Sequence, residues 1–219
     1  HVAFGEWKAL LCGDGLLNGS YGLLSQIVHP LMGEVFKFAT WALGPKGLIQ
    51  GQVMDLSCEM NDSFESLIRT HQLKTGRLLQ VCLVGSYLLS QKGNHKNLYS
   101  EAKDFLRLGQ NLGVLFQLLD DLTELEGETL SQHEQTIGPW FKYGPECMEN
   151  LESSLKVVQQ LIKKYHLNHL SEVLKEYFNK IYSIVEMGRP NIDKHLQKAL
   201  CQEKPNLGPV MLLLQSLGH

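Results

Sequence analysis

The chain has 219 residues, of which 43% are hydrophobic, and its 20 lysines and arginines against 23 aspartates and glutamates give a formal net charge of −3. This composition can bury a core in one large domain or two small ones, and it excludes an intrinsically disordered or collagen-like chain. It also lacks the strong basic excess that favours binding to nucleic acid or to an anionic membrane. We therefore expect no nucleic-acid partner, and any anionic ligand must be held by a local arrangement of charges.

The cysteines indicate the redox environment. They are scattered, odd in number and without a C-x-x-C pair, which favours free, mostly buried thiols in a reducing, cytoplasmic compartment over a disulfide framework or a zinc site. The longest nearly apolar run, Leu78–Leu89, is shorter than the ~20 residues of a membrane span. The chain begins at His1 rather than at a methionine, which leaves a targeting signal open. The five cysteines are Cys12, Cys58, Cys82, Cys147 and Cys201.

In the first half of the chain, apolar residues recur with helical spacing, and strand-like alternation is hard to find. The turn signals Gly44-Pro45 and Gly93-Asn94 divide this half into helical stretches. Residues 126–145 lose the period and are rich in glycine and proline, so we predict a loop there. The predicted helices are Phe4–Leu24, Leu31–Leu43, Lys46–Cys58, Phe64–Leu89 and Asn97–Leu125.

The second half predicts a helical hairpin. Leu151–Tyr165 and Leu170–Val185 are both amphipathic, and only the polar stretch around His166 to His169 separates them. Gly188-Arg189-Pro190 predicts a turn after the pair, and Val210–Leu217 a short final helix. One all-α domain of roughly eight to ten helices, spanning residues 1–219, accounts for the whole pattern.

The helix predicted over Asn97–Leu125 carries an unusual polar face. Gln117, Asp120, Asp121 and Glu124 are spaced i, i+3, i+4 and i+7, so one amide and three carboxyl groups project from one side of an otherwise apolar helix. Desolvating three neighbouring carboxylates is costly unless a cation compensates. Oxygen ligands of this kind suit Mg²⁺, which bridges carboxylates to a substrate phosphate. The alternative is an ordinary acidic patch on a solvated helix face.

A second polar feature is Lys74-Thr75-Gly76, inside the helix predicted over residues 64–89. The lysine and the hydroxyl offer a point charge and a hydrogen-bond donor to a phosphate group, as counter-charge to the acidic face. The alternative is a surface lysine whose stem covers apolar neighbours. Asp14 and Asp55 are isolated acids in apolar surroundings, and we expect them to be structural or to support a nearby site.

Glycines recur inside the predicted helices. Gly13, Gly15 and Gly51 interrupt helical patterns, and Gly109 and Gly113 share the helix of the acidic face. A glycine costs a helix about 1 kcal/mol relative to alanine, so its repeated use favours close helix packing, with an opening for a ligand as the alternative.

Four segments together resemble the trans-isoprenyl diphosphate synthases, the family of farnesyl and geranylgeranyl diphosphate synthases. The resemblance implies an all-α bundle of the isoprenoid synthase type around a central cavity, a homodimer, and Mg²⁺-dependent condensation of an allylic diphosphate with isopentenyl diphosphate. The segments are HVAFGEWKALLCGDGLLNGSYGLL (1–24), GLIQGQVMDL (47–56), KTG (74–76) and FQLLDDLTE (116–124).

The resemblance also implies roles for the polar residues. Asp120 and Asp121 match the start of the family's second aspartate-rich motif, which holds Mg²⁺ against the allylic diphosphate, and Gln117 matches that motif's glutamine. Lys74 and Thr75 match the pair that contacts the diphosphate. Metal ions and Lys74 would then stabilise the charge that develops on the departing pyrophosphate.

The sequence departs from the family pattern in three places. Glu124 stands where the family usually has the third aspartate, a longer ligand with altered geometry. Of the lysines expected after the motif only Lys142 is present, and the family's first aspartate-rich motif would lie upstream of His1. These departures keep two alternatives open: a catalytically incomplete regulatory partner of an active synthase, and a terpene cyclase of the related fold. Product length is not predicted.

Overall fold

The computed structural model describes residues 1–91, 97–127, 129, 138–200, 208 and 210–212, and these residues form helices and connections without a strand. The all-α prediction is confirmed, whereas the single domain around a central cavity stays a prediction. Three short helical turns, Glu59–Asn61, Gln72–Gly76 and Glu124–Glu126, accompany the α-helices. The α-helices are α1 (Glu6–Leu24), α2 (Met32–Leu43), α3 (Leu48–Leu56), α4 (Phe64–His71), α5 (Arg77–Ser90), α6 (Leu98–Thr123), α8 (Pro139–Tyr165) and α9 (Asn168–Leu200).

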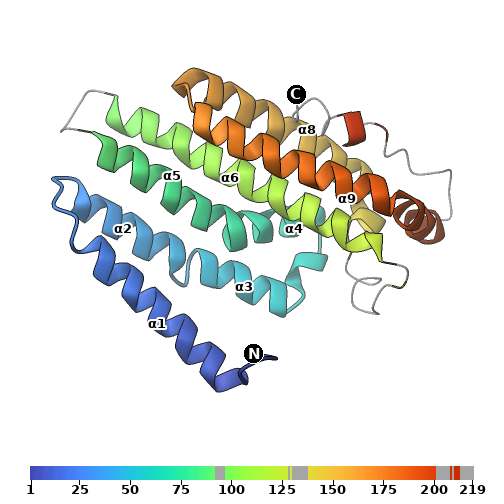
Figure 1. Ribbon diagram of the computed structural model, residues 1–219, viewed down its shortest axis with the longest axis horizontal. Coiled ribbons are helices and arrows are strands. Elements are labelled where there is room, and N and C mark those ends of the chain that lie inside the picture. Colours follow the sequence, from blue (N-terminus) through green and yellow to red (C-terminus); the bar gives the residue numbers. More distant parts are fainter. Residues whose placement is uncertain (92–96, 128, 130–137, 201–207, 209, 213–219) are drawn as a thin grey trace.

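The helices lie side by side, with α1 at one edge and α8 and α9 at the other (Figure 1). Between them, α6 packs against α5 on one side and α8 on the other, and α5 packs against α2. Most of the core gathers along α6, where Leu108, Leu118 and Leu122 are completely buried. Because α6 ends at the acidic residues, this packing fixes the position of the candidate site.

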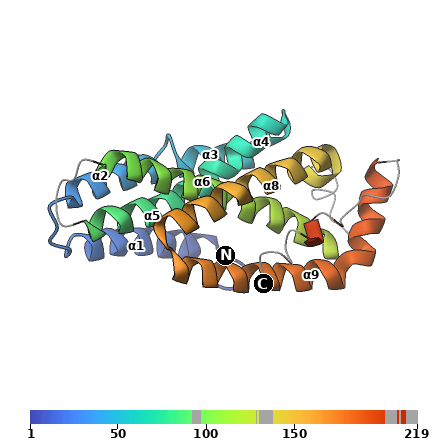
Figure 2. The same ribbon diagram turned by 90° about the horizontal axis from the view of Figure 1, so that it is seen from above.

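The predicted hairpin of α8 and α9 is confirmed, and the two helices run antiparallel (Figure 2). His166 ends α8 in a left-handed conformation, with φ 51°, and α9 begins two residues later. The backbone amide of Leu167 bonds the Ile162 carbonyl at 3.0 Å, which closes the last turn of α8. This tight connection folds α9 back along the bundle.

The end of the predicted loop over residues 126–145 is helical instead. α8 begins at Pro139, which tolerates the first helical position because its missing N–H has no partner there. The indole N–H of Trp140 donates to the Leu118 carbonyl at 2.7 Å, so this first turn is docked on α6. The kink at Tyr143, with φ −132°, explains why the periodicity fails in the sequence. Residues 128 and 130–137 of that loop lie outside the described part.

The turn predicted at Gly188-Arg189-Pro190 is also wrong, because α9 continues to Leu200 and bends in this region (Figure 2). Contacts with the turn after α6 tie down the helix beyond the proline. The side-chain amide of Asn191 donates to the Glu126 carbonyl at 2.8 Å, and the His195 ring lies 2.8 Å from the Gly127 carbonyl. Of the final helix predicted from Val210, residues 210–212 are helical, and the rest lies outside the described part.

The expectation of mostly buried thiols is wrong. Cys12, Cys58 and Cys82 are exposed, because they lie on outward faces or at a helix end. Cys147 lies on the inner face of α8 and is buried in the core. These four thiols are free, as predicted, and Cys201 lies outside the described residues. Nowhere in the described chain does a helix combine the length and the apolar run that crossing a bilayer requires.

Candidate active site

The predicted helix over Phe64–Leu89 is one rod with a change of helical type in the middle. Between α4 and α5, residues Gln72–Gly76 form a π-helical turn, and Lys74 and Thr75 lie within it. Such turns carry one more residue than the α-helix and are frequent at functional sites. Thr75 is partly buried, and Lys74 keeps 33% of its side chain exposed.

Three glycines allow the surrounding helices to reach this turn. A Cβ atom at Gly113 of α6 would overlap the backbone of Gly76, and one at Gly51 of α3 would overlap the backbone at Lys74. A Cβ at Gly109 would lie 2.7 Å from the Gln80 backbone nitrogen of α5. The predicted close packing is therefore confirmed at Gly51, Gly109 and Gly113. It is wrong for α1, where a Cβ at Gly13 or Gly15 would meet no atom within 4 Å.

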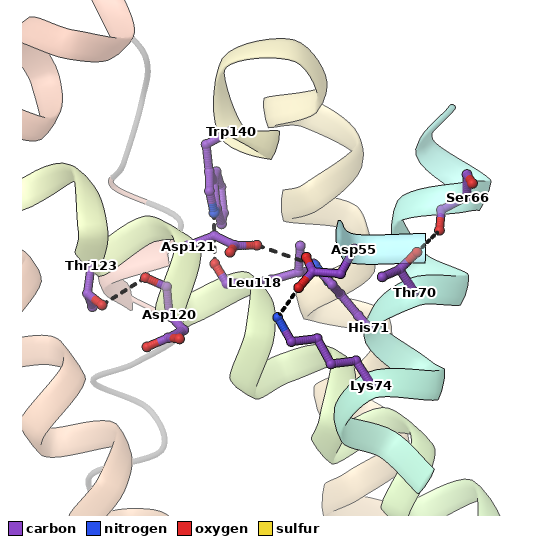
Figure 3. Close-up of polar contacts among 10 residues, drawn as sticks. All are labelled: Asp55, Ser66, Thr70, His71, Lys74, Leu118, Asp120, Asp121, Thr123 and Trp140. Atoms are coloured by element: carbon purple, nitrogen blue, oxygen red, sulfur yellow. Dashed lines mark hydrogen bonds and ion pairs between the residues drawn. The ribbon is translucent and has the colours of Figure 1, made fainter. Parts of the chain in front are cut away.

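Lys74 pairs with Asp55, one of the two isolated acids (Figure 3). Its Nζ lies 2.6 Å from Asp55 Oδ2, and the Asp55 side chain is 25% exposed. α3 thus contributes a carboxylate to the same place as the π turn. The other isolated acid, Asp14, lies on the exposed α1 and takes no part in this cluster.

The acidic face of α6 divides into exposed and partly buried members. Asp120 and Glu124 are exposed, Gln117 is partly buried, and the Asp121 side chain is 20% exposed and turned towards α4. There, Asp121 Oδ2 lies 3.5 Å from Nε2 of His71, whose side chain is 2% exposed.

The pKa values around this contact are strongly shifted. Burial raises the pKa of Asp121 to about 8, and repulsion by Glu124 and Asp120 adds to the effect. Burial, helped by the positive charge of Lys74, lowers the pKa of His71 to about 4. At neutral pH, His71 is therefore neutral, and Asp121 is mainly protonated while no metal ion is bound beside it. Asp121 Oδ2 and His71 Nδ1 are both buried without a hydrogen-bond partner.

A buried carboxyl group with an unsatisfied oxygen beside two exposed carboxylates is a donor set that favours a hard cation. Asp120, Asp121 and Glu124 therefore fit Mg²⁺. In the described part of the chain, however, no three histidine, cysteine or acidic side chains already lie close enough together to form a metal site. The acidic residues would have to move towards one another to hold the metal.

His71 and Trp140 are site residues that the sequence analysis missed. His71 stands three positions before Lys74, on a neighbouring part of the same helix face, and this spacing was the available signal. Trp140 lay in the predicted loop, where nothing marked it. Its bond to Leu118 fixes the start of α8 beside the acidic end of α6 (Figure 3).

Comparison with known proteins identifies the family of this chain. The family model described as polyprenyl synthetase matches residues 1–137, which include all the candidate site residues except Trp140. The chain is similar to farnesyl diphosphate synthase of Bacillus subtilis, at 30% identity over 58% of this chain and 43% of the relative. Geranylgeranyl diphosphate synthase of Pantoea ananas is 32% identical over 63% of this chain and 45% of the relative.

Farnesyl diphosphate synthase of Escherichia coli is 28% identical over 59% of this chain and 44% of its own length. The matched segment thus spans less than half the length of each of these curated relatives. The family match covers more than half of this chain, and the helical structure agrees with it. The chain belongs to the polyprenyl synthetase family.

Proposed function

We propose that the protein is a trans-prenyltransferase that condenses an allylic diphosphate with isopentenyl diphosphate. The allylic C–O bond breaks, and its electron pair leaves with pyrophosphate. The double bond of isopentenyl diphosphate then supplies the electrons of the new C–C bond, and loss of a proton restores an alkene. The observation that carries the proposal is the convergence of Lys74 and Asp55 with Asp121 at the end of α6.

In this proposal, Asp120, Asp121 and Glu124 would hold Mg²⁺, which supplies positive charge to the departing pyrophosphate. Lys74 would bind the same diphosphate when it exchanges Asp55 for a phosphate oxygen. Thr75 and Gln117 would donate hydrogen bonds to it. His71, neutral and buried, would hold the Asp121 carboxyl group in position through the contact between its Nε2 and Asp121 Oδ2.

The test is the turnover of the intact protein with geranyl diphosphate and isopentenyl diphosphate in the presence of Mg²⁺. We expect Asp120→Ala to lower kcat by about 100-fold or more, because it removes a carboxylate that would hold the Mg²⁺ against the leaving pyrophosphate. Glu149→Gln, an exposed carboxylate on α8, is the matched control and should leave kcat unchanged. Turnover of Asp120→Ala near the wild-type rate, with an unchanged melting temperature, would refute the proposal.

A regulatory partner of an active synthase is the second candidate function. Its specific support is the ion pair of Lys74 with Asp55, which neutralises the lysine that would otherwise attract a diphosphate. This function predicts no product from the protein alone, and an altered rate or product length when it is mixed with an active synthase. An unchanged product profile in the mixture would reject it. A cyclic hydrocarbon product would instead identify a terpene cyclase.

We also propose a homodimer, as the family resemblance implies, in the reducing, cytoplasmic compartment that the cysteine pattern favours. The exposed apolar residues of α1 offer a surface that such an interface could cover, among them Trp7, Leu10 and Leu16. Light scattering of the intact protein should give twice the mass of one chain.

A further inference from the structure

A cavity lies on another face of the rod that carries Lys74. Its volume is about 950 Å³, and its lining includes Glu65, Arg69 and Gln72, which recur at i, i+4 and i+7. His71 and Lys74 do not line it. The rod of α4 and α5 thus presents one face to the candidate active site and a different face to this cavity.

The cavity is rich in positive charge although the whole chain is negative. Lys46 precedes α3, Arg69 lies on α4, and Arg77 begins α5, so three separate segments bring a cation to one place. Glu65 is the one acidic residue of the described lining, and no ion pair is found there between it and the three basic side chains. Charges of one sign in a concave site favour an anion with several charges.

Arg77 is held in a fixed orientation. Its guanidinium group stacks over the ring of Trp41, 4.3 Å from the ring centroid, and its NH1 donates to Gln80 Oε1 at 2.8 Å. Gln80 is 2% exposed and donates in turn to the Leu106 carbonyl at 2.9 Å. Such a chain of contacts reduces the entropy that Arg77 would lose on binding a ligand.

One donor of this arginine is left unsatisfied. Arg77 Nε is buried and has no hydrogen-bond partner. Burial also lowers the pKa of Arg77, which means that the protein solvates this charge poorly. A buried donor without a partner is costly, so an acceptor supplied by a ligand would recover that cost.

We propose that this cavity binds a small molecule that carries several phosphate groups. Arginine forks match phosphate oxygens in geometry, and Lys46 adds a point charge. The amide side chains of Gln50, Gln110 and Asn150 line the same space and can contact the polar remainder of the ligand. A volume near 950 Å³ accommodates a molecule of nucleotide size. The proposal uses none of the residues assigned to prenyl transfer and stands independently of that function.

The test is calorimetric titration of the intact protein with inorganic tripolyphosphate in the presence of EDTA, so that the acidic face of α6 contributes no metal-bound site. We expect Arg69→Gln and Arg77→Gln each to weaken binding by about tenfold or more, since each removes a charged contact. Lys74→Gln and Arg189→Gln, an exposed arginine on α9, should change the affinity by less than about twofold. Arg69 is the more informative position, because its side chain is exposed and forms no hydrogen bond or ion pair with the described part of the chain.

Three outcomes would overturn the proposal: no binding by the wild type at millimolar tripolyphosphate, equal affinity in all variants, or a loss confined to Lys74→Gln. The last outcome would place the anion in the candidate active site. A parallel assay of prenyl transfer keeps the two proposals separate. Tripolyphosphate binding in this cavity can be absent while turnover persists, and turnover can be absent while the cavity binds tripolyphosphate.

Discussion

α1 and α6 are both long helices with glycines in their interiors, yet they are stabilised in different ways. Eleven of the 26 residues of α6 are buried, whereas none of the 19 residues of α1 is. A Cβ atom at the glycines of α6 would overlap neighbouring backbones, whereas one at the glycines of α1 would meet no atom of another element within 4 Å. Glycine therefore permits close helix packing in α6, whereas in α1 it only lowers the helix propensity. The helical period of the sequence does not distinguish these two cases. Matched substitutions in the two helices test this difference.

The largest expected effect is the loss of a core side chain from α6. Leu122 is 0% exposed, so Leu122→Ala should lower the free energy of unfolding by about 3 kcal/mol, within the usual range for a leucine cavity. Leu10 on α1 is 68% exposed in the single chain, so Leu10→Ala should change the free energy of unfolding by less than about 0.5 kcal/mol where the chain is monomeric, whereas the proposed homodimer would cover this face. Urea unfolding followed by circular dichroism measures both. Equal losses in the two variants would show that α1 is buried against something in solution.

A methyl group added at a glycine sharpens the comparison. Gly113→Ala forces α6 away from the π turn at Gly76 and should cost about 2 kcal/mol, because backbone atoms cannot yield as a flexible side chain can. Gly15→Ala meets no atom within 4 Å and should stabilise α1 by up to about 1 kcal/mol. Thermal unfolding curves should therefore shift in opposite directions, and shifts of the same sign would contradict the assigned packing.

A smaller effect is expected at Asp104, where α6 meets the end of α8. Asp104 Oδ2 accepts hydrogen bonds from Lys164 Nζ at 2.6 Å and from the Tyr165 hydroxyl at 2.8 Å, and these contacts lower the pKa of Asp104 below its usual value. Asp104→Asn should cost roughly 1 kcal/mol at pH 7, mainly through the weaker bond to Tyr165.

The pH dependence of this loss has a definite sign. Because the folded state lowers the pKa of Asp104, its contribution to stability is complete above the unfolded pKa near 3.8 and is lost as the pH falls through the lower folded value. The difference between wild type and Asp104→Asn should therefore be constant from pH 7 to about pH 5 and shrink below about pH 4. Glu149→Gln provides the control, and a difference that grows towards low pH would contradict the assignment.

The sequence predicted the helices well, because amphipathic periods report the faces that are buried. It failed where a tertiary contact offset a local signal. Pro190 and Gly188 form a turn signal, but bonds from Asn191 and His195 to the segment after α6 keep α9 helical. Trp140 similarly holds the first turn of α8 in a segment whose glycines and prolines predict a loop.

The candidate site could be predicted only as a list of residues. The spacing of Gln117, Asp120, Asp121 and Glu124 gave a common face, and the structure adds that this face is split between an exposed part and a buried contact with His71. The partner of Lys74 proved to be Asp55, 19 positions away, and no period in the sequence connects those two residues. Their roles in metal and diphosphate binding stay predictions.

The π turn at Gln72–Gly76 inserts an extra residue between α4 and α5, so α5 is rotated about the rod axis relative to the position it would have in a continuous α-helix. α4 packs against α3, α6 and α8, whereas α5 packs against α2 and α6, so the two halves of the rod have different sets of neighbours. Deleting one residue from this turn would restore a continuous α-helix and rotate one half by about 100° relative to the other. The core contacts of α5 and the direction of Lys74 could not both survive that rotation. In this family member, the length of the segment between His71 and Arg77 should therefore tolerate no change, even where its side chains can be replaced.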